Sequence, residues 1–473
     1  MSDASAGKPK PTITPTNQSD PGSATTAANQ PSPEPASAPA SQPSPEPTIT
    51  PTDQAGREYT ITPAEQTVLD RLDEKWLIEL TQSLLQATGQ NPPGDEAATV
   101  AVLSAAATEL GLQVIDTVVE PGRNNLSITL PGGDEPGLLL LGHTDVVPIG
   151  DGWTTDPFGG ELVDGRIYGR GASDMKGGLA ASLAAMAALR ETNLRGPVEL
   201  AALVDEEETG KGIRAYVGSK QTTQQRTPPP EHDHPTDQTG DQAVQFRGCI
   251  TTEPTDLQTI IGARGDSYLR VEVHGRACHA GNPADGANAI YGAAAIVAEI
   301  ERLHAELALA PHPLLGPATW SVGQIHGGTG GSIVPAECVL VADRRLLPGE
   351  SPDAVLDELR ARVAALHLED RGLTVDLAMP MEMPAFETPA DAELVRATDT
   401  ALAAAGGPGL PLGGWTAACD GGYVARDLAV PVVVLGPGSV TTQAHRADES
   451  VSVEELLIAA RAYTLAALRL LGR

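Results

Sequence analysis

The sequence is poor in aromatic, cysteine and basic residues. Aromatic residues make up only 3% of its 473 residues, although 41% are hydrophobic, so aliphatic side chains must fill any core. Lysine and arginine number 31 against 62 aspartates and glutamates, which gives a formal net charge of −31. Because nucleic acids and anionic membranes attract basic surfaces, this charge argues against both as partners. We interpret the acidity as a feature that favours solubility.

The four cysteines lie far apart and form no CxxC pair; they are Cys249, Cys278, Cys338 and Cys419. This spacing is typical of reduced thiols and predicts no disulfide framework. The sequence also lacks an apolar run at its start, and no run approaches the roughly 20 residues that a membrane span needs. We therefore expect a cytoplasmic protein without a membrane anchor.

Residues 1–61 are rich in proline, serine, threonine and alanine, and the string PTITPT occurs in them twice. Such a segment buries too little apolar area to offset its chain entropy, so we predict that it is disordered. It is either dispensable or a segment that binds a partner. Order is expected to begin at Thr62, because Thr62, Pro63 and Glu65 form a capping box.

Beyond this point, apolar runs typical of buried strands alternate with segments of helical periodicity. Strands are expected at 112–118, 126–130, 138–141, 198–204 and 432–435, and helices at 95–110, 176–189, 391–405 and 453–471. This alternation predicts an α/β fold with a mainly parallel sheet. The helical spacing of Leu69, Leu72, Trp76, Leu80 and Leu84 adds helical structure before the first strand.

Two segments interrupt the alternation. Residues 219–246 are polar and read as a flexible insertion, in which His232 and His234 either bind metal or, as we favour, belong to a solvated loop. Residues 264–377 give the order strand, helix, two strands, helix, strand, with the first helix expected at 285–303 and the last strand at 373–377. This order is typical of a ferredoxin-like α+β domain. We therefore expect this domain to be inserted into a catalytic domain formed by residues 62–263 and 378–473.

Several clusters of possible metal ligands follow the expected strands. LLLLGHTDVVP places His143 and Asp145 directly after a buried strand, where ligands gather in open α/β sheets. A carboxylate that fixes one histidine nitrogen leaves the other for a metal, although a structural His–Asp pair is the simpler interpretation of this motif alone. GRGASDMKGG places Asp174 before a helix, where it either binds metal or caps the helix.

Three further clusters complete the set. VDEEETGKG brings Glu206 and Glu207 to a strand end, where the repulsion within an acidic run is relieved either by solvent or by a bound cation. TTEPT supplies Glu253, and GPGSVTTQAHRADE supplies His445 after another buried strand. Two histidines with several carboxylates suit Zn²⁺, with Mn²⁺ or Co²⁺ as substitutes.

In these motifs, and in GRACHAGNP, the chain resembles the M20 family of co-catalytic zinc amidohydrolases, in particular acetylornithine deacetylase and succinyl-diaminopimelate desuccinylase. The six motifs occur in the family's order between Pro63 and Arg473, with only the insertion near 219–246 left out. The resemblance implies two divalent metal ions, a catalytic domain and an inserted lid domain that also forms a homodimer.

The resemblance also implies a role for each residue. Five residues would bind the metals, namely His143, Asp174, Glu207, Glu253 and His445, with Asp174 bridging the two ions and the Asp174–Met175 peptide in the cis form. Asp145 would orient His143, and Glu206 would be the general base. His279 would reach from the lid to stabilise the oxyanion, and Arg345, in DRRLLPGE, would bind a substrate carboxylate.

The expected reaction is the hydrolysis of an N-acyl amino acid, in which a water activated by the metals attacks the amide. A metallocarboxypeptidase or dipeptidase is the nearest alternative, and a non-catalytic metal-binding or scaffold protein is a more distant one. The chain departs from the family at Ser332, where an asparagine is common. Cys419 is expected to pack in the core rather than act as a nucleophile.

Overall fold

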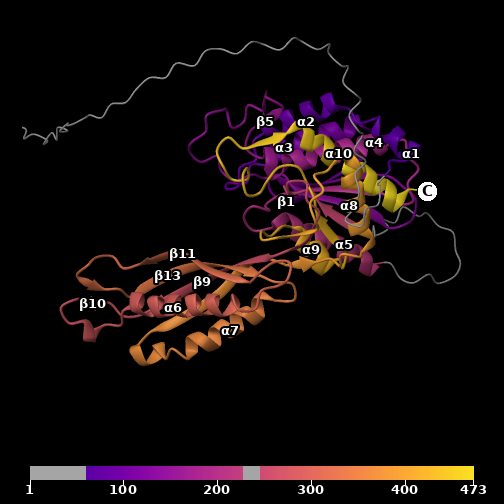
Figure 1. Ribbon diagram of the computed structural model, residues 1–473. Helices are drawn as coiled ribbons and strands as arrows, with labels where there is room; N and C mark the ends of the chain where they lie inside the picture. Colours follow the sequence, from indigo (N-terminus) through magenta and orange to yellow (C-terminus); the bar gives the residue numbers. More distant parts are fainter. Residues whose placement is uncertain (1–59, 227–245, 473) are drawn as a thin grey trace, which may run out of the picture. The chain divides into compact units, whose positions relative to one another are not determined.

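The computed structural model describes residues 60–226 and 246–472 (Figure 1), so the predicted tail and the histidines of the insertion lie outside the described residues. The capping box is present: Thr62 and Glu65 bond each other's backbone at the start of α1 (Pro63–Leu69). Asp73 then caps α2 (Glu74–Gln86) through the backbone N of Trp76 at 3.0 Å. The helical spacing between Leu69 and Leu84 therefore spans two helices, with a break at their junction.

A nine-stranded sheet forms the centre of the larger part of the chain, in the order β1-β2-β6-β3-β7-β17-β8-β15, with β16 also on β8. The strands are β1 (Gln113–Glu120), β2 (Arg123–Leu130), β3 (Gly137–His143), β6 (Val198–Leu203), β7 (Phe246–Thr251), β8 (Ile260–Ala263), β15 (Phe386–Glu387), β16 (Gly413–Trp415) and β17 (Val432–Val434). The four central neighbours β6, β3, β7 and β17 are parallel. The predicted parallel sheet is thus found at the centre, with antiparallel strands at both edges.

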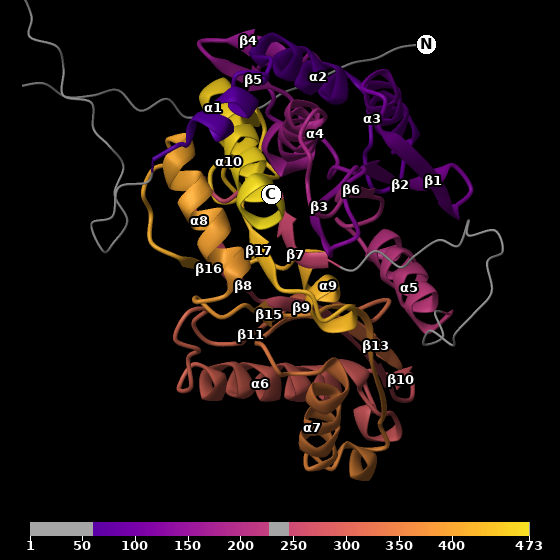
Figure 2. The ribbon, with the colours of Figure 1, turned by 90° about the vertical axis from the view of Figure 1, so that its right-hand side faces the viewer.

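Helices cover both faces of this sheet, and the side chains of β3 alternate between the two faces. Leu138 and Leu140 join the core on one side, while Leu139 and Leu141 join the core on the other. The helices α1, α2, α3 (Ala97–Glu109), α4 (Gly177–Leu189), α8 (Glu393–Ala405) and α10 (Val453–Leu471) cover the first side. The helices α5 (Lys211–Arg226) and α9 (Gly421–Asp427) cover the second (Figure 2).

The second sheet has the order β11-β13-β9-β14, formed by β11 (Thr319–Gly327), β13 (Glu337–Leu346), β9 (Gly265–His274) and β14 (Thr374–Met383). All neighbours are antiparallel, and α6 (Ala289–Leu307) and α7 (Pro352–Ala364) pack on one face through Leu269, Val271 and Val273. The chain order β9, α6, β11, β13, α7, β14 is the predicted ferredoxin-like pattern. We refer to this unit as the lid.

Three expected boundaries differ in the structure. α5 continues to Arg226, so the helix extends into the segment from 219 that we expected to be flexible. α6 starts at Ala289 rather than at 285, because the side chain of Asn288 accepts hydrogen bonds from Ile290 N and Tyr291 N and so caps it. β14 runs on to Met383, well past 377.

The remaining elements are short. They are β4 (Glu161–Val163), β5 (Arg166–Tyr168) and β18 (Ser450–Ser452), which form a three-stranded sheet, the pair β10 (Cys278–His279) and β12 (Ile333–Val334), and three irregular turns at Ala172–Lys176, Pro283–Asp285 and Leu368–Arg371. All four cysteines are free, as predicted. Among the described residues, no helix is long and apolar enough to cross a membrane.

Candidate metal centre and active site

Neighbouring parallel strands deliver most of the predicted ligands to one edge of the large sheet. His143 is the last residue of β3, Glu206 and Glu207 follow β6, Glu253 follows β7, and His445 lies in the loop after β17. Parallel strands end at the same edge, so residues far apart in sequence meet there. The turn before α4 adds Asp174 to this group.

Asp174 stands between the two histidines. Its Oδ1 lies 3.1 Å from His143 Nε2, and its Oδ2 lies 3.3 Å from His445 Nε2. Glu253 Oε1 is 3.6 Å from His143 Nε2, and Glu207 Oε2 is 3.1 Å from His445 Nε2. The possible ligand atoms therefore form two clusters, His143–Asp174–Glu253 and Asp174–Glu207–His445. Asp174 belongs to both, with one carboxylate oxygen beside each histidine. Asp174 does not cap α4, whose first turn has no side-chain cap.

Asp145 organises this edge from behind. Its backbone carbonyl accepts a hydrogen bond from His143 Nδ1 at 2.9 Å, which leaves the Nε2 lone pair directed at the cluster. Its carboxylate accepts from the backbone N of Glu206 at 3.2 Å and of Glu207 at 3.1 Å. The orientation of His143 that we predicted for Asp145 thus comes mainly from the carbonyl, while the carboxylate positions the two glutamates.

Two residues that sequence reasoning missed also shape the site. Asn91 donates to Asp145 at 2.9 Å and to Asp205 at 3.0 Å, and so links the loops after β3 and β6. Glu449 accepts from the backbone N of Gly171, Ser173 and Asp174 at 2.9 to 3.0 Å. Glu449 is part of the HRADE motif, which was a usable signal, whereas nothing in the sequence near Asn91 indicates its distant partners. The Asp174–Met175 peptide is cis, as the resemblance implied.

Burial and mutual repulsion shift the protonation of the cluster. Burial raises the pKa of Glu253 and of Glu206 well above the usual range, and neighbouring carboxylates add to both shifts. Burial alone would raise the pKa of Asp174, but hydrogen bonds with His143 and His445 hold it low. Hydrogen bonds with Asp174 and Glu207 raise the pKa of His445 to about 10. Carboxylates packed this closely need positive charge among them.

These residues fit divalent metal ions. Glu207 belongs to the second cluster, and its Oε1 atom is buried without a hydrogen-bond partner among the described residues. A buried carboxylate oxygen without a donor is costly, and a cation satisfies it. Imidazole nitrogens mixed with carboxylates are the donor set of zinc and related metals. Glu206 belongs to neither ligand cluster.

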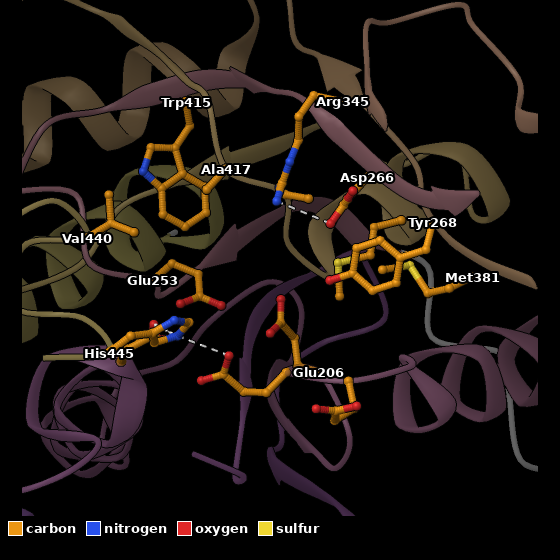
Figure 3. A pocket seen from close by; sticks show the side chains of 15 residues that line it. Glu206, Glu253, Asp266, Tyr268, Arg345, Met381, Trp415, Ala417, Val440 and His445 are labelled. Atoms are coloured by element: carbon orange, nitrogen blue, oxygen red, sulfur yellow. Dashed lines mark ion pairs between the residues drawn. The ribbon is translucent and has the colours of Figure 1, made fainter. Parts of the chain in front are cut away.

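A pocket opens over the cluster and includes residues of the lid (Figure 3). Its lining contains Asp174, Glu206, Glu207, Glu253 and His445 on the sheet side, and Asp266, Tyr268, Arg345, Met381 and Met383 from the lid. The structure thus brings Arg345 to the site. It does not bring His279 there: that side chain is exposed on β10, and its Nδ1 accepts from Gly281 N at 3.0 Å. Ser332 is also exposed outside the pocket.

Cys419 packs in the core beneath the site. It is only 1% exposed, and burial raises the pKa of its thiol well above the usual range, so the reactive thiolate is disfavoured. These observations support packing, as we expected, over a nucleophilic role.

The arrangement of the site agrees with the sequence comparison. Residues 139–469 match the model of peptidase family M20/M25/M40. The chain belongs to this family. It is therefore a metal-dependent hydrolase that acts on amide bonds, and the alternative of a non-catalytic scaffold is not supported.

Several solved structures share the fold at low identity. Human carnosine dipeptidase 1 is 17% identical with a TM-score of 0.63, and the match covers 86% of this chain and 99% of that one. A metallo-carboxypeptidase of the family from Sulfolobus solfataricus is 20% identical with a TM-score of 0.64, covering 84% and 99%. A dinuclear metal-binding peptidase from Bacillus subtilis is 16% identical with a TM-score of 0.61, covering 84% and 98%.

Proposed function

We propose that this M20 enzyme hydrolyses the amide bond of an N-acyl amino acid with the help of two divalent metal ions, Zn²⁺ in the first instance. The observation that carries the proposal is the sharing of Asp174 by two ligand clusters while Glu206 stands outside both. The B. subtilis structure of the same fold is described as dinuclear, which supports two ions rather than one.

His143 and Glu253 would hold one ion, Glu207 and His445 the other, and Asp174 both. When bound, the ions lower the pKa of a water molecule and stabilise negative charge on the amide oxygen. Asp145 keeps His143 in the tautomer that binds metal, and it holds the backbone of Glu206 and Glu207 in place. Glu449 fixes the turn that carries Asp174.

Glu206 moves the proton. Its side chain lines the pocket, is 9% exposed, and is not needed as a ligand. It takes a proton from the attacking water and delivers it to the leaving amine, which is the division of labour expected of two adjacent glutamates. Burial keeps its pKa high, so the carboxylate is a better base than an exposed glutamate.

The lid supplies substrate contacts. Arg345 lines the pocket, and its Nε and Nη2 bond acidic neighbours, so among the described residues Nη1 is the donor nitrogen without a partner. We assign to Nη1 the α-carboxylate of the substrate. His279 lies outside this pocket, so we propose that it contacts the oxyanion either after the lid closes or from the lid of a second copy in a homodimer. A metallocarboxypeptidase or dipeptidase remains the second candidate, because relatives with the same fold carry those names.

The proposal predicts that wild-type enzyme loaded with Zn²⁺, Mn²⁺ or Co²⁺ hydrolyses N-acetyl or N-succinyl amino acids faster than dipeptides. Glu206→Gln should lower kcat by about 10²- to 10⁴-fold, because proton transfer contributes on that order. The metal content, measured by elemental analysis, should stay at two ions per chain. Glu191→Gln is the matched control, because this side chain is 82% exposed, pairs with Arg71 and does not line the pocket over the cluster.

Near-normal turnover by the Glu206→Gln enzyme with both metals bound would show that another group is the base. Faster cleavage of dipeptides than of every acyl amino acid would favour the second candidate.

A further inference from the structure

We propose that Asp266 forms a subsite for a positively charged side chain of the substrate, so that the preferred substrates are amides of basic amino acids. This inference rests on the proposed function, because it concerns the amino-acid part of the same substrate. It is carried by the lid wall of the pocket, whose lining includes Asp266, a carboxylate with one oxygen paired to Arg345 and the other buried without a hydrogen-bond partner among the described residues.

Strand register places four polar side chains in one block on the lid wall. Asp266 on β9 lies opposite Arg345 on β13, and Tyr268 lies opposite Asp343. Side chains two residues apart on a strand point to the same face, and directly opposed residues are neighbours. The helices α6 and α7 pack on the other face, through the intervening residues Leu269 and Val271, so this block is free to face the pocket.

Arg345 is already engaged within the block. Its Nε and Nη2 donate to the Asp343 carboxylate at 3.2 and 3.0 Å, and Nη2 lies 3.3 Å from Asp266 Oδ2 (Figure 3 draws the latter pair). Two carboxylates thus share one guanidinium, and the block keeps a net negative charge when both are ionised. Glu208 adds a further carboxylate to the pocket lining.

The second oxygen of Asp266 is the unsatisfied atom. Asp266 is only 4% exposed, and its Oδ1 is buried with no hydrogen-bond partner among the described residues. An ionised carboxylate only accepts hydrogen bonds, so its missing partner must be a donor. A ligand ammonium or guanidinium supplies both the donor and the opposite charge.

The neighbouring surface suits an aliphatic stem. The register shifts between Ala378 and Met381 on β14, at a bulge that contains Pro380, which has no N–H for the ladder. The extra residue sets Met381 opposite Tyr268 and Met383 opposite Asp266. Both methionines and Trp415 line the pocket. Flexible thioethers and an indole ring provide apolar walls for the methylenes that lead to a terminal cation.

A carboxylate side chain fits this block poorly. Such a group would have to displace Asp343 or Asp266 from Arg345, and it would then lie beside the oxygens of both. The Nη1 edge of Arg345 serves the α-carboxylate, which all N-acyl amino acids share. We therefore expect Asp266 to determine which substrate side chains are preferred.

The test compares matched substrates on the wild-type, metal-loaded enzyme. N-acetyl-L-lysine is paired with N-acetyl-L-norleucine, and N-acetyl-L-ornithine with N-acetyl-L-norvaline, so each pair differs only in the terminal amine. We expect kcat/KM to be at least tenfold higher for the cationic member of at least one pair, mainly through KM. N-acetyl-L-glutamate should be the poorest substrate.

Asp266→Asn should then bring the cationic-to-neutral ratio to within about threefold of unity. Asp376→Asn, the same change at an exposed position of β14, should leave the ratio as in the wild type. If Asp266→Asn does not fold, the wild-type comparison still decides the question.

Hydrolysis of all substrates without a preference for the cation, or with glutamate as the best, would overturn the inference while leaving the proposed function in place. Hydrolysis of none of them would overturn the proposed function as well.

Discussion

Single side chains in this protein are held by partners that lie far away in the sequence. Asp145 connects two backbone segments, because it fixes His143, two residues before it, through its carbonyl and the two glutamates after β6 through its carboxylate. Asn91 ties this carboxylate to Asp205, which in turn lies 2.9 Å from Arg123. The proposed metal ligands therefore rest on a buried polar network whose members are mutually satisfied, which favours a single geometry.

At the same scale, the proposed subsite predicts a pH-dependent specificity. Burial is the main cause that raises the pKa of Asp266 to about 7. Asp343 adds to this shift, and Arg345 opposes it. Tyr268 also lies in this block, and burial raises its pKa to about 12, while Met383 of β14 lies opposite Asp266. The carboxylate is therefore charged above pH 7 and neutral below it.

Preference for a cationic side chain should accordingly be present at pH 8 and be lost as the pH falls through 7. Between pH 8 and pH 6, the ratio of kcat/KM for N-acetyl-L-lysine over N-acetyl-L-norleucine should fall by about tenfold, as one ionisation allows. Ionisations of the metal centre change kcat/KM for both substrates equally, so their effect cancels in the ratio. A ratio that is constant over this range would contradict the assignment.

At the scale of elements, α4 links the metal centre to the core. Twelve residues of this helix are buried, and it packs between the sheet and α10. Its second residue, Gly178, approaches the loop that carries Glu253: a Cβ there would lie 2.1 Å from the backbone O of Thr252. Because neither the helix nor the strand end can move freely, a larger residue would force them apart.

Gly178→Ala should therefore destabilise the protein by about 1–3 kcal/mol, which is the usual cost of overpacking. Gly218→Ala in α5 is the matched control, because nothing lies within 4 Å of a Cβ at that position. It should stabilise by about 0.5–1 kcal/mol, since alanine loses less backbone entropy in a helix. Urea unfolding followed by circular dichroism measures both. Equal midpoints for the Gly178→Ala and wild-type proteins would refute the close approach.

For the whole molecule, metal binding and folding should be coupled, because the ligands come from segments that meet only in the folded state. Removal of metal with EDTA should lower Tm by several degrees, and added Zn²⁺ should restore it. Ligand present at a thousand times its Kd stabilises by about 4 kcal/mol, which is enough for such a shift.

Two variants separate coordination from catalysis in this measurement. Asp174→Asn should lose most of the zinc-dependent rise in Tm, since Asp174 belongs to both clusters, while Glu206→Gln should keep it. If Asp174→Asn showed the full rise, or if EDTA left Tm unchanged, the assignment of these residues as ligands would be wrong.

The sequence alone was enough to predict the parallel core, the ferredoxin-like lid and the residues that gather at the strand ends. Buried strands such as 138–141 are continuous apolar runs, and each is followed at once by a polar motif. Such local patterns determine local structure, and parallel strands necessarily bring their ends together. The family motifs then specified which polar residues matter.

Only the tertiary structure decided what surrounds these residues. Asn91 and Glu449 act on partners contributed by other loops, and Asp266 meets Arg345 only through the pairing of β9 with β13. The bulge near Pro380 reverses which side of β14 faces the pocket, and no period-2 pattern reveals such a reversal in advance. The proposed metal centre therefore follows from short motifs, whereas the acidic wall proposed to select the substrate depends on long-range register, which the sequence does not display.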